Sequence, residues 1–235
     1  MSSPAVSLPD VGVVIVAGGV GVRAGPGEPK QFRPILGVPM LLRALRPFTS
    51  HPAVGHVVVV VPKIYADRPP EWLAKLQGER LTLVAGGEER MLSVRAGLAA
   101  LPESVATVLV HDAARPFVSR STIDGVIARA RSGVGAVAAL PVSDTVKEVI
   151  DGHRIVKTVA RERLWRAQTP QGFPRPMIVA AYAEPGKDGG VPTDDAALCE
   201  RAGFPVEVVE DAPQNLKVTT ADDFRIAEAL ARDLR

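Results

Sequence analysis

The chain has 235 residues, of which 46% are hydrophobic and 23% are charged. Both fractions are typical of globular proteins and exclude a disordered or fibrous chain, and the length suits a single α/β domain. Lys and Arg outnumber Asp and Glu by only 28 to 26, and aromatic residues make up 4%. This composition provides neither the basic surface nor the stacking platforms of nucleic-acid-binding proteins, so we expect no nucleic acid as a partner.

Two features bear on the compartment. The single cysteine, Cys199, permits no intramolecular disulfide, and its place in an apolar helical pattern predicts a buried thiol. The first residues lack the basic start and apolar region of a secretory signal, and the longest purely aliphatic run, residues 57–61, is too short to span a bilayer. We therefore expect a cytoplasmic protein with no membrane partner.

Short runs that are apolar and β-branched throughout predict strands that are buried on both faces. These runs cover residues 11–17, 56–61, 81–85, 105–110 and 134–140. Helical patterns lie between and after them, over residues 39–48, 70–77, 89–101 and 121–131. This alternation predicts βαβ units in a mostly parallel, doubly wound sheet, in which ligands bind beyond the carboxyl ends of the strands.

The first predicted strand leads into a glycine-rich segment, residues 17–30, whose backbone N–H groups could surround a phosphate. Arg23 and Lys30 add two cations to it. Pro26 prevents the helix that a dinucleotide-binding motif requires, and Gln31 follows Lys30 where a Walker motif has Ser or Thr. On its own, the segment fits a phosphate-binding loop and a solvated surface loop equally well.

The pattern changes after residue 141. Two β-like stretches, residues 144–150 and 154–160, flank Asp151-Gly152, which is a strong signal for a tight hairpin. This pair predicts an arm inserted into the α/β body. The remaining expected elements are a helix over 193–202, a strand over 206–209 and a helix over 221–234 with Thr220 as its N-cap.

Chemically informative motifs follow several of these elements. The fourth predicted strand ends in His111-Asp112-Ala113-Ala114-Arg115-Pro116, where a carboxylate opposite a phosphate loop could bind Mg²⁺. The other motifs, in chain order, are Pro29-Lys30-Gln31-Phe32, Gly86-Gly87-Glu88-Glu89-Arg90, Gln168-Thr169-Pro170-Gln171, Thr193-Asp194-Asp195 and Asn215-Leu216-Lys217. From about residue 13 to the C-terminal helix, this ordered set resembles the 2-C-methyl-D-erythritol 4-phosphate cytidylyltransferases of the non-mevalonate isoprenoid pathway.

The resemblance implies a Rossmann-like nucleotidyltransferase fold that forms a single domain over residues 1–235. It also implies a protruding β-arm at about residues 141–175, which would join two subunits into a homodimer. The implied reaction transfers a cytidylyl group from CTP to 2-C-methyl-D-erythritol 4-phosphate and releases pyrophosphate, with Mg²⁺ as cofactor. Because the attacking phosphate is already anionic, the protein mainly has to hold two polyanions together with fixed cations.

Site residues also follow from the resemblance. The expected catalytic residues are Arg23 and Lys30 on the triphosphate, Lys217 on the reacting phosphates, and Arg161, which the partner subunit's arm would bring to the acceptor phosphate. The expected substrate-binding residues are Ala17, Gly18, Gly19, Gly86, Glu88, Ser93, Asp112, Ala113, Arg115, Thr145, Thr169 and Thr193, and Asp112 is also the expected metal ligand.

More ordinary roles compete for four of these residues. Lys217 could be a plain lysine at a strand end, and Arg161 could belong to a solvated run of charges. Ser93 could cap a helix, and Arg115 could pair with a surface carboxylate. These alternatives stay open on the sequence.

Glu88, Ala160 and Asp195 depart from the family pattern, because Asp, Asp and Glu are common at these positions. None of these departures removes a cation. A ribitol 5-phosphate cytidylyltransferase is the nearest alternative, whereas sugar-1-phosphate and molybdopterin nucleotidyltransferases fit residues 168–171 less well. A nucleotide-binding regulator without turnover is the alternative from another class.

Overall fold

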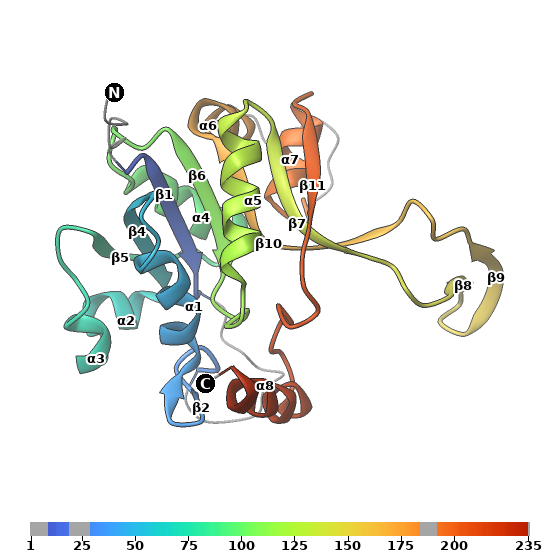
Figure 1. Cartoon of the computed structure of the whole chain (residues 1–235), viewed down its shortest axis with the longest axis horizontal. Coiled ribbons are helices and arrows are strands. Elements are labelled where there is room, and N and C mark those ends of the chain that lie inside the picture. Colours follow the sequence, from blue (N-terminus) through green and yellow to red (C-terminus); the bar gives the residue numbers. More distant parts are fainter. Residues whose placement is uncertain (1–8, 19–28, 184–191, 235) are drawn as a thin grey trace, which may run out of the picture.

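The computed structural model describes residues 9–18, 29–183 and 192–234 (Figure 1). The strands of its central sheet are β1 (Val11–Val16), β4 (Val54–Val61), β5 (Leu81–Ala85), β6 (Thr107–Asp112), β7 (Gly135–Pro141), β10 (Trp165–Pro174) and β11 (Val206–Glu210). Two hairpins pair β2 (Pro34–Ile35) with β3 (Val38–Pro39), and β8 (Val146–Ile150) with β9 (Arg154–Val159). The helices are α1 (Met40–Thr49), α2 (Lys63–Asp67), α3 (Glu71–Ala74), α4 (Arg90–Ala99), α5 (Arg120–Arg131), α6 (Arg175–Ala183), α7 (Asp195–Arg201) and α8 (Ala221–Asp233).

The central sheet has seven strands in the order β11-β7-β10-β6-β1-β4-β5. Neighbouring strands are parallel except around β10, which runs antiparallel to both β6 and β7. The predicted mostly parallel, doubly wound sheet is therefore confirmed. The predicted elements end within two residues of the observed ones, except that the helix expected over 70–77 is only α3, since the chain turns at Gly78 to enter β5.

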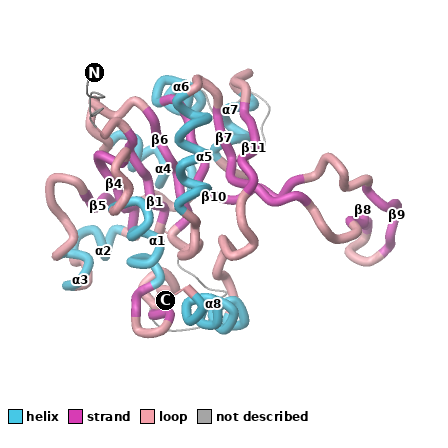
Figure 2. Tube along the Cα trace, in the orientation of Figure 1, coloured by secondary structure: helices cyan, strands magenta, loops and turns pink. Residues whose placement is uncertain are grey.

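Helices cover both faces of the sheet, as Figures 1 and 2 show. Val13 and Ile15 of β1 belong to the core formed with α1 and α5, whereas Val14 belongs to the core formed with α4, α6 and α7. The central strands are continuously hydrophobic because neither of their faces meets water. Cys199 is fully buried in the second core, as predicted, and burial raises the pKa of its thiol to about 12.

Helix α8 lies beyond the carboxyl ends of the strands and packs on Ile35 and Val218 (Figure 1). Thr220 caps it as predicted. The Thr220 hydroxyl accepts from the Asp223 backbone N–H at 3.2 Å, and the Asp223 carboxylate accepts from the Thr220 backbone N–H at 2.8 Å. This capping box fixes the chain just after Lys217.

The arm, defined here as residues 142–164, carries β8 and β9 away from the body (Figure 1). Asp151 and Gly152 have φ values of 53° and 76°, which confirms the predicted tight turn. Residues 165–174, which the sequence analysis included in the arm region, instead form β10 between β6 and β7. The sequence pattern misses this strand because its buried part, residues 168–173, is mostly polar and contains Pro170 in place of an aliphatic run.

In the part of the chain that the structure describes, no helix combines the length and the apolar character needed to cross a bilayer.

Candidate active site

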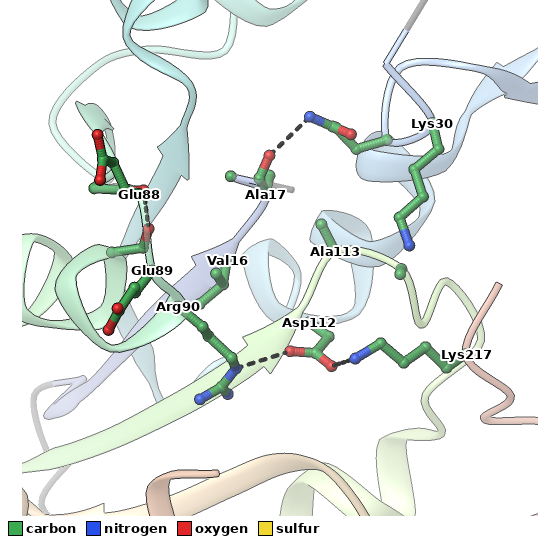
Figure 3. Close-up of a pocket in the computed structure, with 14 residues that line it drawn as sticks. Val16, Ala17, Lys30, Glu88, Glu89, Arg90, Asp112, Ala113 and Lys217 are labelled. Carbon is green, nitrogen blue, oxygen red and sulfur yellow. Dashed lines mark hydrogen bonds and ion pairs between the residues drawn. The ribbon is translucent and has the colours of Figure 1, made fainter. Parts of the chain in front are cut away.

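A cavity of about 200 Å³ opens beyond the carboxyl ends of β1 and β6 (Figure 3), where the fold class predicts a ligand. The expected site residues that line it are Ala17, Gly18, Lys30, Glu88, Ser93, Asp112, Ala113 and Lys217. Arg115, Thr169 and Thr193 line an adjoining cavity, and its wall shares Arg90, Asp112 and Lys217 with the first. We call the first the β1 cavity and the second the β10 cavity.

Five expected residues are not among the described residues that line the two cavities, and one of them, Gly86, lies beside Ser93 in the loop after β5. Gly19 and Arg23 fall outside the described residues. Thr145 and Arg161 are exposed on the arm and are not among the described residues that line either cavity. Arg161 donates to the Ser143 carbonyl within its own arm.

Four side chains form a line of alternating charges, of which Lys217, Asp112 and Arg90 lie in the wall between the two cavities. Lys217 Nζ lies 2.8 Å from Asp112 Oδ2, and Arg90 Nε lies 3.5 Å from Asp112 Oδ1 (Figure 3). The other guanidinium nitrogens of Arg90 donate to both carboxylate oxygens of Asp195, at 2.9 and 2.7 Å. The charged ends thus hold one another in place from α4, β6, α7 and the segment after β11.

The protonation states of this line are set by its neighbours. Burial alone would raise the pKa of Asp112, but the charges of Lys217 and Arg90 outweigh burial and hold that pKa well below its ordinary value. Burial would likewise lower the pKa of Arg90, but the Asp195 carboxylate raises it above the ordinary value. Asp112 is therefore anionic and Arg90 cationic at neutral pH.

A chain of hydrogen bonds, which we call the relay, links the Arg115 carbonyl, the His111 ring, the Thr169 hydroxyl and the Asp112 backbone N–H. His111 Nε2 faces the Arg115 carbonyl at 3.0 Å and must carry the proton. Burial lowers the pKa of His111 to about 4, so the ring is neutral and its Nδ1 accepts from the Thr169 hydroxyl at 3.1 Å. The Thr169 oxygen in turn accepts from the Asp112 backbone N–H at 3.0 Å. These hydrogen bonds fix the turn that carries Asp112, and they engage the hydroxyl of Thr169, one of the expected substrate-binding residues.

Asn215 anchors the segment after β11, which carries Lys217. Its side-chain amide donates to the Thr169 carbonyl at 2.8 Å and to Asp211 Oδ2 at 2.5 Å. Its backbone carbonyl accepts from Arg115 Nη1 at 2.7 Å and from the Gln168 side chain at 3.0 Å. Arg115 is therefore a buried bracing residue, and the surface pairing that competed for it is not observed.

On the opposite side of the β1 cavity, Ser93 is the fourth residue of α4 and is buried. Glu89 is the N-cap, so the capping role that competed for Ser93 is not observed. A Cβ at Gly86 would come within 2.7 Å of the Ser93 oxygen, so only glycine lets the chain pass this close. This approach brings the loop after β5 against the cavity.

Lys30 and Lys217 lie together on one side of the β1 cavity, and Glu88 and Glu89 lie on the other (Figure 3). Lys30 Nζ donates to the Val218 carbonyl at 3.2 Å. The Gln31 side chain donates to the Ala17 carbonyl at 2.8 Å, which ties the Lys30 segment to the end of β1.

The sequence analysis assigned no role to Arg90, His111, Asp195 and Asn215, although all four stand in the motifs it quoted. Each contacts at least one partner that is distant in the chain, as Asp195 contacts Arg90 across 105 positions. Their membership of the motifs was the available signal. Their pairing was not readable without the fold.

Asp112 is the expected metal ligand. Among the described residues, no group of three or more His, Cys, Asp or Glu side chains could hold a metal ion. Mg²⁺ commonly uses one or two carboxylates and takes its remaining ligands from substrate phosphates and water. One ionised carboxylate in a cavity that also contains Lys30 and Lys217 fits a magnesium ion that arrives with a nucleotide.

Comparison with known proteins points to one family. The family model for 2-C-methyl-D-erythritol 4-phosphate cytidylyltransferase matches residues 11–233. A protein of that name from Syntrophus aciditrophicus is 42% identical over 233 residues, covering 95% of this chain and 97% of the relative. The crystal structure of the enzyme of that name from Thermus thermophilus matches with a TM-score of 0.76 and 33% identity, covering 93% of this chain and 98% of the other. The 4-diphosphocytidyl-2C-methyl-D-erythritol synthase from Anaerococcus prevotii matches with a TM-score of 0.81 and 27% identity, covering 94% and 96%.

Proposed function

The chain belongs to the 2-C-methyl-D-erythritol 4-phosphate cytidylyltransferase family, and from this premise we propose how its residues divide the work of the reaction. The enzyme transfers the cytidylyl group of CTP to 2-C-methyl-D-erythritol 4-phosphate and releases pyrophosphate, a step of isoprenoid biosynthesis. The observation that carries the proposal is the line of alternating charges between two cavities at the carboxyl ends of β1 and β6.

The two lysines on one side of the β1 cavity would bind the triphosphate. The acceptor phosphate attacks the α-phosphorus and needs no strong base, so stabilising charge on the phosphorus centre and on pyrophosphate is the main task. Lys30 and Lys217 line the cavity, and Arg23, outside the described residues, would join them. In a water-poor site each such cation contributes several kcal/mol, an order-of-magnitude figure.

The rest of the β1 cavity would bind cytosine and ribose. Backbone groups at Ala17, Gly18 and Gly86 and the side chains of Glu88 and Ser93 would contact this part of CTP, with Gly19 and Ala113 contributing as well. The close approach of Gly86 to Ser93 supports this role, since a backbone that must approach a ligand favours glycine. The β10 cavity, lined by Arg115, Thr169 and Thr193, would take the acceptor.

Asp112 would hold Mg²⁺ together with phosphate oxygens, and the ion would supply neutralising charge to the triphosphate when bound. The low pKa of Asp112 supports this role, because a metal ligand must be deprotonated.

We also propose a homodimer in which the arm completes the partner's site. The arm exposes Val149, Ile150, Ile155 and Val156, each at least 41% accessible, on an isolated two-stranded hairpin. Such hairpins are only marginally stable alone, so this apolar surface needs a cover. Arg161 and Thr145 sit on the arm and away from the cavities of their own chain, so they would reach an acceptor only in the partner.

The dimer is tested by mixing two inactive variants, Lys30→Ala and Arg161→Ala. In a mixed dimer, one site combines an intact Lys30 with an intact Arg161 from the other subunit. Random reassortment makes half of the dimers mixed, so roughly a quarter of wild-type turnover should return. No recovery after denaturation and joint refolding, from variants that still form dimers, would contradict a shared site.

The reaction is tested by measuring pyrophosphate release with CTP and 2-C-methyl-D-erythritol 4-phosphate, with ribitol 5-phosphate as the rival acceptor and ATP, GTP and UTP as control nucleotides. Release with the methylerythritol substrate and CTP is expected. A preference for ribitol phosphate would retain the mechanism and reassign the acceptor. We place the reaction in the cytoplasm, a proposal supported by the single buried, reduced thiol at Cys199 and testable by cell fractionation.

A further inference from the structure

The wall shared by the β1 and β10 cavities contains Arg90, Asp112 and Lys217. Behind it stands Asp195, which is 0% exposed and is not among the described residues that line either cavity. Burying a carboxylate costs free energy unless the group is paired, so the partners of Asp195 indicate its role.

Asp195 is fully engaged by its surroundings. Both of its oxygens accept from the Arg90 guanidinium, and Oδ1 also accepts from the Tyr182 hydroxyl at 2.5 Å. The side-chain oxygen of Gln171, Oε1, accepts from the backbone N–H of Ala196, the residue after Asp195, at 2.9 Å. These contacts fix the start of α7 and give the carboxylate one orientation.

Arg90 contacts two carboxylates. Its two terminal nitrogens donate to Asp195, and its Nε lies 3.5 Å from Asp112 Oδ1 as an ion pair. A lysine could satisfy one of these carboxylates but could not bridge both with fixed angles. The orientation of the Asp112 carboxylate therefore depends on a contact that Asp195 makes from outside both cavities.

We propose that Asp195 and Arg90 are positioning residues that couple the two cavities: Asp195 orients Arg90, and Arg90 orients the Asp112 carboxylate in the wall between them. The inference rests on the proposed function for what fills the cavities. It predicts that removing a charge that touches neither substrate weakens binding of the nucleotide on the far side of the wall.

The test uses the full-length protein and measures CTP binding by calorimetry without acceptor, and then the KM of each substrate and kcat. Asp195→Asn keeps the shape of the side chain but weakens its hold on Arg90, and Arg90→Lys keeps the charge but loses the fork. Each should weaken CTP binding and lower kcat/KM by about ten- to a hundred-fold, the usual range for small misplacements of catalytic groups. The double variant should lose no more than Arg90→Lys alone, because both changes break one link.

Matched controls separate coupling from loss of stability. Arg95→Lys and Glu200→Gln make the matching substitutions at exposed charged residues on the same two helices, α4 and α7, and these variants should bind CTP like the wild type. His51→Gln removes a buried hydrogen bond to Asp124, made at 2.8 Å, and should lower the melting temperature without changing CTP binding. Asp195→Glu, which restores the charge, should recover part of the CTP affinity.

Normal CTP affinity in a folded Asp195→Asn protein, or additive losses in the double variant, would overturn the coupling. If Asp195→Asn does not fold, normal CTP affinity in Arg90→Lys would overturn it in the same way. Failure of the proposed function would look different: the wild type would bind CTP but release no pyrophosphate with 2-C-methyl-D-erythritol 4-phosphate, and the binding series would still report the coupling.

Discussion

His111 should make the stability of this protein depend on pH between about 4 and 6.5. Burial lowers the pKa of the folded-state ring from 6.5 to about 4. Between these values the unfolded chain binds a proton that the folded chain does not, so the free energy of unfolding falls as the pH falls. The contribution is complete above pH 6.5 and lost below pH 4.

The size of the effect follows from the shift. One pKa unit corresponds to about 1.4 kcal/mol, so lowering the pKa by the amount seen here removes roughly 3 kcal/mol, mostly by pH 4.5. The group is 0% exposed, so solvent screening reduces this little. Against a typical total stability of about 5–15 kcal/mol, the loss is easily measured.

The assay is urea unfolding followed by tryptophan fluorescence at pH 7.5 and pH 4.5 for the wild type and His111→Gln. Glutamine cannot titrate in this range and can still donate to the Arg115 carbonyl. The variant should be less stable at pH 7.5 but should lose roughly 3 kcal/mol less than the wild type on acidification. His153→Gln, on the exposed hairpin turn, should behave like the wild type. Equal losses in wild type and His111→Gln, or a His111 ring that titrates near pH 6.5 by NMR, would refute a neutral, buried relay.

Two further predictions concern packing at the ends of elements. Gly86→Ala should raise the KM for CTP about ten-fold, because the new methyl would lie 2.7 Å from the Ser93 oxygen. If this steric clash causes the effect, adding Ser93→Ala should restore part of the CTP affinity. If lost backbone contacts cause it, the second substitution should restore none. Thr220→Ala should lower the free energy of unfolding by about 1 kcal/mol through loss of the capping box, with KM values unchanged, as thermal unfolding and kinetics on the same preparations would show.

Local patterns predicted most of the α/β body because its strands are buried on both faces. A strand such as β4, with five consecutive valines at residues 57–61, can be predicted from its composition alone. The hairpin turn at Asp151-Gly152 was equally readable, since both residues adopt positive φ values. Such features depend on a few neighbouring residues, and the sequence displays them directly.

β10 and the hydrogen bonds of the site could not be predicted, because they depend on residues that are distant in the sequence. Gln168, Thr169 and Gln171 are polar and yet at most 8% exposed, because their partners are Asn215, His111 and Asp194 on distant segments. A polar run predicts a loop unless those partners are known. The motifs located the site, and the fold was needed to show which motif residues brace the others.

The line of charges between the cavities also explains how Arg90 and Lys217 remain charged in this site before a polyanionic substrate binds. Asp195, Arg90, Asp112 and Lys217 alternate in sign and sum to zero, so neither cation is buried without a counter-charge. The two ends differ, however: the side chain of Asp195 is 0% exposed and that of Lys217 is 45% exposed. The guanidinium nitrogens of Arg90 contact the carboxylates of Asp195 and Asp112, whereas the Lys217 ammonium has three donors and uses one of them for Asp112. In the proposed mechanism, Lys217 can therefore bind a phosphate while it keeps its contact with Asp112. Arg90 stays fixed by Asp195 and holds Asp112, and through it Lys217, in place.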